Sequence, residues 1–228
     1  MSSNFKTIKQ ATIDISPLAL AVIPWGILSG TIAVNIGLTL FQAQAMSLFI
    51  FAGAAQLSAM TLISGGASAL SISGSVFAIS SRHLLYSIDL RKEVYKLPLK
   101  WKIALAFFLT DEMYAVTKAH MLKTGKFSKL YSLWAGIVFY IVWNLSTYIG
   151  IVMGEKIDNL DKLGLDFAIV AVFVAITAEH LKSLPMFVTT IVSGLASIYF
   201  KSRYPDTYVI ISALIGMLCG YLVSKVAK

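Results

Sequence analysis

Residues 131–153 read YSLWAGIVFYIVWNLSTYIGIVM, a long apolar stretch without a charged side chain. A helix needs about 20 apolar residues to cross the hydrocarbon core of a bilayer, which is about 30 Å thick. We therefore predict that this stretch forms a membrane-spanning helix. Further apolar stretches lie on both sides of it, at residues 15–37, 43–64, 68–90, 101–117, 164–180, 184–200 and 207–225.

The whole chain is poor in charge, since 57% of its 228 residues are hydrophobic and only 13% are charged. Soluble domains have about 25% charged residues. We therefore predict an all-α fold, a polytopic integral membrane helical bundle of six to eight membrane segments, with membrane lipid around it. Residues 1–228 are expected to form a single transmembrane domain, with a weak internal repeat of 15–90 and 131–200 as an open alternative.

The net charge of +8 does not indicate a nucleic-acid partner, because the basic residues lie in short gaps between apolar segments and no binding motif accompanies them. Loops rich in Lys and Arg stay on the cytoplasmic side of a membrane. Residues 91–102 and 118–130 are both basic, so both are expected inside. Either the segment 101–117 between them turns back, or one loop violates the rule.

Two of the apolar segments contain charges that lipid disfavours, namely Arg82 in 68–90 and Asp111 with Glu112 in 101–117. Each costs about 2.5 to 3.5 kcal/mol at the centre of a membrane helix. Such segments are expected to be broken, buried or re-entrant. The charges are interpreted either as a wet binding site or as a salt bridge that joins the two segments.

Helical spacing places the polar residues of each segment on one face. One face carries Arg82, Tyr86 and Asp89, and the other carries Asp111, Tyr114 and Lys118. In this arrangement Arg82 could bind a carboxylate, and Asp111 or Glu112 could hold an ammonium group or a coupling proton. His83 is a weaker candidate for proton transfer because it follows a cation.

Small residues mark other positions where helices pack closely or unwind. Residues 52–56, AGAAQ, interrupt an apolar span, and Gln56 offers a donor and an acceptor to a substrate or to freed backbone. Pro24 removes a backbone donor just before Gly26, so Pro24, Gly26 and Gly30 are predicted to form a hinge or a packing face. The G-x-x-x-G spacings, which favour close helix packing, are Gly26 with Gly30, Gly150 with Gly154, and Gly216 with Gly220.

Signatures of enzymes are absent from the sequence. It contains no H-E-x-x-H, G-x-S-x-G or Walker A motif and no Cys/His cluster with metal-binding spacing. We therefore predict no catalytic residue, no metal and no cofactor.

Four stretches together resemble the AzlC family, the large subunits of two-component branched-chain amino acid exporters. The order and spacing of the four match that family, whereas residues after about 130 carry no matching motif. The stretches are VIPWGILSG at 22–30, FAGAAQ at 51–56, SRHLLYS at 81–87 and LTDEMY at 109–114.

The resemblance implies a multi-pass protein of a prokaryotic cytoplasmic membrane that exports valine, leucine and isoleucine, with methionine as a further candidate. It also implies a small hydrophobic membrane subunit (AzlD-like) as partner and secondary transport, which we expect to be proton-coupled. A zwitterionic amino acid needs an anion, a cation and an apolar pocket. Candidate residues for substrate binding are Trp25, Gly53, Ala54, Gln56, Arg82, Tyr86, Asp111 and Tyr114, with Phe51 beside them.

Two alternatives remain open at this point. A channel would use the buried polar residues as a water-filled lining. A membrane scaffold would use the G-x-x-x-G faces to hold a partner, with Arg82 and Asp111 in a structural role.

Overall fold

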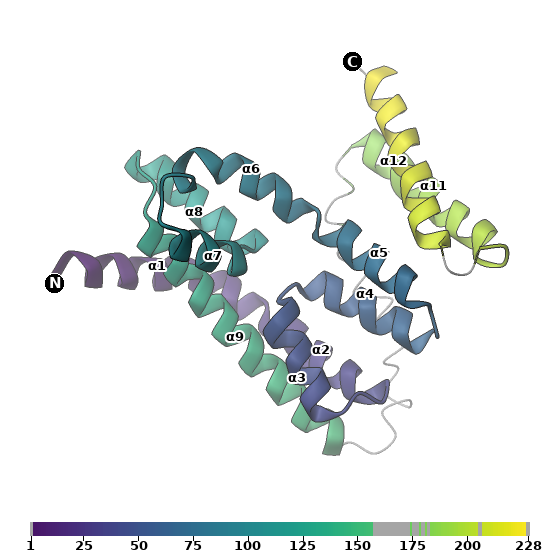
Figure 1. Cartoon of the computed structure of the whole chain (residues 1–228), viewed down its shortest axis with the longest axis horizontal. Helices are drawn as coiled ribbons and strands as arrows, with labels where there is room; N and C mark the ends of the chain where they lie inside the picture. Colours follow the sequence, from purple (N-terminus) through teal and green to yellow (C-terminus); the bar gives the residue numbers. More distant parts are fainter. Residues whose placement is uncertain are drawn as a thin grey trace. The chain divides into compact units, whose positions relative to one another are not determined.

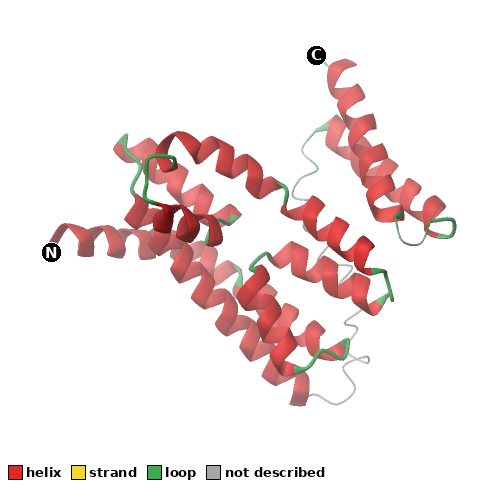
Figure 2. Ribbon diagram, viewed as in Figure 1, coloured by secondary structure: helices red, strands yellow, loops and turns green. Residues whose placement is uncertain are grey.

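The computed structural model of the protein describes residues 2–156, 174, 178, 181, 183–204 and 207–226. All regular secondary structure in these ranges is helical (Figure 2), as predicted. The helices that precede residue 81 are α1 (Ser2–Ala21), α2 (Ile23–Asn35), α3 (Leu40–Ile50), α4 (Gly53–Ser64) and α5 (Ala69–Ser80). The later helices are α6 (Arg82–Val94), α7 (Leu99–Phe107), α8 (Asp111–Thr124), α9 (Lys129–Lys156), α11 (Leu184–Lys201) and α12 (Tyr208–Val226).

The chain divides into two compact units. The first unit comprises Met1–Gln56 and Ser80–Ile157, and the second comprises Leu57–Ile79 and Asp158–Lys228. All four of the sequence stretches that carry the family resemblance lie within the first unit.

Four predicted segments are broken, and each break overlaps one of those four stretches (Figure 1). The axes of α1 and α2 differ by 50° around Val22, just before Pro24. The other helices stop and restart at residues 51–52, at residue 81 and at residues 108–110. Breaks in 68–90 and 101–117 were expected from their charges, whereas the charge-free segments 15–37 and 43–64 are broken too.

A seam of glycines joins α2 to α9, which lie side by side in Figure 1. A methyl group added to Gly30 would collide with the backbone of Thr147 and Ile151, and one added to Gly150 would collide with the backbone of Ile27. Thr31 donates a hydrogen bond of 3.0 Å across the seam to the carbonyl oxygen of Gly150. The first two G-x-x-x-G spacings therefore pack against each other, with both backbones at close range.

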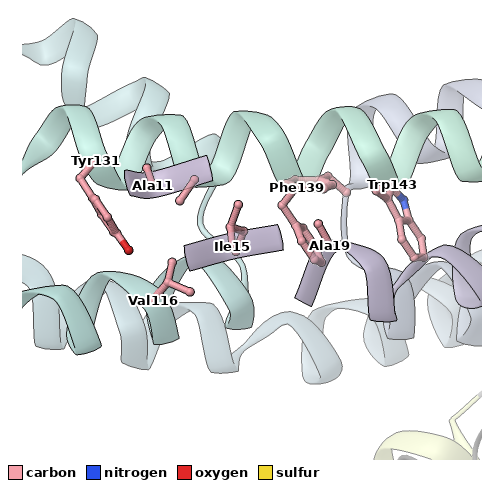
Figure 3. Packing of buried hydrophobic residues seen from close by; sticks show 9 residues of the cluster. Ala11, Ile15, Ala19, Val116, Tyr131, Phe139 and Trp143 are labelled. Carbon is pink, nitrogen blue, oxygen red and sulfur yellow. The ribbon is translucent and has the colours of Figure 1, made fainter. Parts of the chain in front are cut away.

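Helix α1 covers another face of α9 with small and branched side chains (Figure 3). Ala11, Ile15 and Ala19 are spaced by one helical turn and are almost fully buried. They meet Tyr131, Ala135, Phe139 and Trp143 of α9, together with Phe51 and Val116. This cluster fixes α9 as the central helix of the first unit.

In the second unit α11 and α12 form a closely packed helix pair. The third G-x-x-x-G spacing lies in this contact, since added methyl groups at Gly216 and Gly220 would meet Ser193 and Thr189. Ser58 and Ser75 share a hydrogen bond of 2.8 Å between α4 and α5.

Within the described ranges, α9, α11 and α12 are long and apolar enough to cross a membrane, and the bent pair α1–α2 raises the number to four. The prediction of six to eight spans is therefore not confirmed. Its physical basis was the length of apolar segments, and breaks leave several of these segments as helices too short to cross alone. Apart from residues 174 and 178, the predicted segment 164–180 lies outside the described residues, and so does part of the proposed repeat 131–200.

Candidate functional site

Helix α6 begins with a cation, which is an unfavourable position for one. The N-terminus of a helix carries a partial positive charge, so an arginine there needs a nearby anion. Arg82 is the first residue of α6, and the helix keeps its remaining basic residues, Arg91 and Lys92, in its last turn. Arg82 therefore requires an acidic partner from another element.

Helix α8 has two acidic residues in its first turn, where α6 has none. Thr110 is extended and caps α8 by accepting a hydrogen bond of 3.3 Å from the backbone N–H of Met113. This cap places Asp111 and Glu112 in the first turn. The partial positive charge of the helix N-terminus stabilises both carboxylates there.

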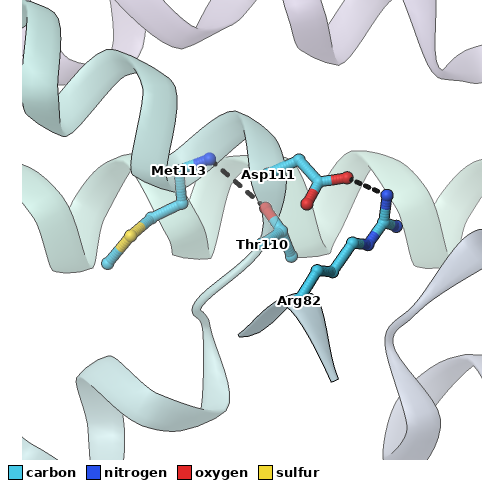
Figure 4. Close-up of polar contacts among 4 residues, drawn as sticks. All are labelled: Arg82, Thr110, Asp111 and Met113. Carbon is cyan, nitrogen blue, oxygen red and sulfur yellow. Dashed lines mark hydrogen bonds and ion pairs between the residues drawn. The ribbon is translucent and has the colours of Figure 1, made fainter. Parts of the chain in front are cut away.

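The two helix starts meet in an ion pair, shown in Figure 4. Arg82 Nη1 lies 2.7 Å from Asp111 Oδ2, and each side chain is about one-third exposed. Arg82 Nε and Asp111 Oδ1 are themselves shielded from solvent and have no hydrogen-bond partner. The pair thus neutralises both charges but leaves one donor and one acceptor unsatisfied, which is costly for shielded polar atoms.

Two more contacts follow the ion pair along the same helices. The rings of Tyr86 and Tyr114 stack with centroids 4.5 Å apart, and Lys118 Nζ lies 2.8 Å from Asp89 Oδ2. Tyr114 also donates a hydrogen bond of 3.0 Å to Asp89. We call this set the polar ladder; its members are Arg82, Tyr86 and Asp89 of α6 and Asp111, Tyr114 and Lys118 of α8.

The order of these contacts gives the relative direction of α6 and α8. Residues 82, 86 and 89 meet 111, 114 and 118 in the same order, so α6 and α8 run in the same direction. Helix α7 must then return from the end of α6 to the start of α8. Residues 101–117 therefore turn back, and the basic segments 91–102 and 118–130 extend from the same end of the ladder. Of the two alternatives left by the sequence, the structure favours the turn.

The outer end of the ladder is the most exposed part of it. Hydrogen bonding to Asp89 is the main cause that raises the pKa of Lys118 above its ordinary value.

The predicted residues His83 and Glu112 lie beside the ladder and are half-buried. The ring of His83 meets the ring of Tyr86 at its edge, with centroids 6.1 Å apart.

A second group of predicted residues lies where α3 ends and α4 begins. Phe51 is buried there with a left-handed backbone, at φ +42°, which costs a residue with a side chain about 1 to 2 kcal/mol. Its ring contacts those of Phe107, Phe108 and Tyr140 at centroid distances of 6.4, 6.5 and 4.8 Å. Burial among these rings offsets the strain and links the α3–α4 break to the α7–α8 break.

The remaining predicted residues surround this aromatic cluster. Gly53 lies against the indole of Trp143, Ala54 is half-buried, and Trp25 packs on the core formed with α9. Gln56 is 1% exposed, and its Oε1 has no hydrogen-bond partner, like Nε1 of Trp143. Both groups therefore have unused hydrogen-bonding capacity, and within the described residues no hydrogen bond joins Gln56 to the ladder.

Pro24, Gly26 and Gly30 belong to the bend between α1 and α2 and to the glycine seam. Pro24 follows the bend between α1 and α2, and the two glycines face α9 in the seam. The contacts of the glycines are those of a packing face.

One polar contact was not anticipated from the sequence. Tyr131, which is 1% exposed, donates a hydrogen bond of 2.6 Å to Asp14 of α1, and the ring of His120 stacks on Tyr131 with centroids 3.9 Å apart. The sequence signal was present, because Asp14 directly precedes Ile15 at the edge of an apolar segment. The segment was expected to begin after Asp14, whereas α1 begins at Ser2.

Comparison with known proteins supports the resemblance seen in the four stretches. The model of the AzlC protein family matches residues 17–157. An uncharacterized membrane protein of Helicobacter pylori strain 26695 is 28% identical over 186 residues, which cover 80% of this chain and 79% of the relative. One from Archaeoglobus fulgidus is 29% identical over 168 residues, covering 73% of this chain and 72% of the relative. No solved structure gives a significant match.

Proposed function

Because the chain belongs to the AzlC family, we propose that it is a secondary transporter that exports branched-chain amino acids. The family and the membrane-protein relatives support a transport-related role for a membrane protein rather than an enzyme. The finer proposal names valine, leucine and isoleucine as substrates, with methionine as a further candidate. It includes a small hydrophobic membrane subunit as partner and the cytoplasmic membrane of a prokaryote as location.

The ion pair between Arg82 and Asp111 is the observation that carries this proposal. An amino acid is a zwitterion, so its carboxylate can replace Asp111 at Arg82 while its ammonium group replaces Arg82 at Asp111. The exchange leaves no charge unpaired, and it provides partners for Arg82 Nε and Asp111 Oδ1. Since both atoms are shielded, the exchange requires the α5–α6 and α7–α8 breaks to move apart.

The apolar part of the substrate needs a pocket of its own. The aromatic cluster around Phe51 joins the α7–α8 break, where Asp111 begins α8, to the α3–α4 break with Gly53 and Ala54. Small residues beside large rings suit a short branched side chain. The unsatisfied amide oxygen of Gln56 would accept a hydrogen bond from the substrate or from its water.

Proton coupling follows from the same exchange of partners. While the two breaks are apart and no substrate is bound, Asp111 has lost Arg82 as its partner and lies next to Glu112 in the sequence of the first turn of α8. A second negative charge nearby raises the pKa of a carboxyl group, which favours the uptake of a proton. We assign the coupling proton to Asp111 or Glu112.

Transport by the purified full chain in proteoliposomes tests the proposal. Counterflow of labelled valine is measured with and without a co-purified small membrane subunit, and proton coupling is measured separately with an imposed pH gradient. Arg82→Gln and Asp111→Asn are expected to lower the initial rate by about tenfold to a hundredfold, because each removes a charged hydrogen-bond partner. Asp89→Asn is the matched control, since it neutralises an acid at the exposed end of the same ladder.

Other outcomes would contradict the proposal at different points. Flux that rises linearly with valine concentration would indicate a channel, and absence of counterflow with the partner present would indicate a scaffold. If Asp111→Asn and Glu112→Gln both transport valine with unchanged pH dependence, neither residue carries the coupling proton.

A further inference from the structure

A pocket of about 330 Å³ lies between the end of α6, α7 and the beginning of α8. None of the six residues of the polar ladder lines it. Its inner wall consists of a buried apolar cluster from all three helices, formed by Leu90, Leu105, Leu109 and Met113. An apolar wall of this kind fits a hydrocarbon chain.

The charged residues that line the pocket are both cations. Arg91 from the last turn of α6 and Lys102 from α7 contribute to the lining, and no carboxylate does. Both belong to the basic segment 91–102, which extends from the same end of the ladder as segment 118–130. Basic segments are attracted to the anionic leaflet on the cytoplasmic side of a membrane.

The two helices that supply these cations also carry apolar side chains on their outer surfaces. Leu85 and Ile88 of α6 are 66% and 68% exposed, and Leu99 of α7 is 70% exposed. Side chains of this kind face acyl chains in a membrane protein. A molecule with a hydrocarbon chain and a negative head group therefore matches both the wall and the lining charges of the pocket.

We propose that this pocket binds an anionic phospholipid, with an acyl chain against the apolar wall and the phosphate on Arg91 and Lys102. The binding does not depend on the transported substrate, so the result of its test does not depend on whether the proposed function is correct. The two cations favour an anionic over a zwitterionic head group, because the latter brings its own positive charge.

The test uses the purified full chain in detergent, titrated with phosphatidylglycerol or with phosphatidylcholine that has the same acyl chains. Bound lipid is counted by native mass spectrometry. We expect an affinity for phosphatidylglycerol about tenfold or more above that for phosphatidylcholine. The double variant R91Q/K102Q should lower the affinity for phosphatidylglycerol by about tenfold.

The double variant K92Q/K96Q is the matched control, because it removes the same charge from the same segment at residues that do not line the pocket. It should retain phosphatidylglycerol binding within about twofold. Ala106→Trp, which fills the pocket from α7, should lower the affinity for both lipids. These variants separate the head-group contact from the acyl-chain contact.

Three results would overturn the proposal. They are equal affinities for the two lipids, an equal loss in K92Q/K96Q and R91Q/K102Q, and displacement of bound lipid by inorganic phosphate alone. If A106W binds both lipids like the unmodified protein, the acyl chain does not occupy the pocket.

Discussion

The glycine seam between α2 and α9 and the polar ladder between α6 and α8 join helices of the same unit by opposite means. In the seam the backbones touch, because Gly30 and Gly150 have no side chains to hold them apart. In the ladder the helices are joined through the long side chains of Arg82 and Lys118. One contact depends on the absence of side chains and the other depends on their reach.

This difference suggests how the two contacts behave when the protein changes conformation. Interlocked backbones cannot slide without a collision, so the seam keeps α2 and α9 in one arrangement. Charged side chains can exchange partners, provided that every charge finds another partner. We therefore interpret the seam as the fixed frame and the ladder as the contact that opens.

The largest effect is expected from a methyl group in the seam. Gly150→Ala places Cβ against the backbone of Ile27, and two helices must separate to admit it. Overpacking of this kind costs about 1 to 3 kcal/mol or more, which exceeds the gain of about 1 kcal/mol from replacing a helical glycine by alanine. Thermal unfolding in detergent should show a clear loss of stability.

Gly194→Ala is the matched control for the seam. Gly194 also lies within a helix, but a methyl group added there meets nothing within 4 Å. The variant should be as stable as the unmodified protein or more stable. Equal stability of the two alanine variants would mean that α2 and α9 are not locked by their backbones.

An intermediate effect is expected from exchanging the charges of the inner ladder contact. Arg82→Asp and Asp111→Arg should each lower stability, whereas the double variant should regain part of the loss because an ion pair forms again. The pair is one-third exposed, so we expect a coupling energy of only about 1 kcal/mol. Valine transport should stay lost in the double variant, since the carboxylate and ammonium sites have changed places.

The double variant separates the two interpretations of the ladder. Recovery of both stability and transport would assign Arg82 and Asp111 a structural role alone. Recovery of stability without transport is the result expected for a substrate-binding pair.

The faces of the ladder could be predicted from the sequence, and a salt bridge between the two segments was one of the alternatives, but the relative direction of the two helices could not be predicted. Helical spacing places Arg82, Tyr86 and Asp89 on one face whatever the partner is. The partner and its direction depend on the turn of α7, which hydropathy and charge left as one of two alternatives. The order of the ladder contacts, from Arg82 with Asp111 to Asp89 with Lys118, supplied the missing direction.

The places of the breaks were marked in the sequence by charge, by Pro24 or by the small residues 52–56. Arg82 and Asp111 made lipid an unfavourable environment, so interruptions were expected near them. The left-handed backbone of Phe51 had no signal of its own, because an apolar ring in this conformation has the hydropathy of any other phenylalanine. Its position depends on Phe107, Phe108 and Tyr140, which are distant in the sequence.

The smallest effect is expected at the outer end of the ladder. Asp89 and Lys118 are exposed, and exposed ion pairs contribute little because water and salt screen them. Asp89→Asn and Lys118→Gln should change valine transport by less than about twofold, like Lys123→Gln as the exposed control. The raised pKa of Lys118 means that its contribution is present below the ordinary lysine range and is lost as the pH rises through the higher folded-state value. If Asp89→Asn instead abolishes transport as Asp111→Asn does, the ladder opens and closes as one unit, and its exposed end is as necessary as its shielded one.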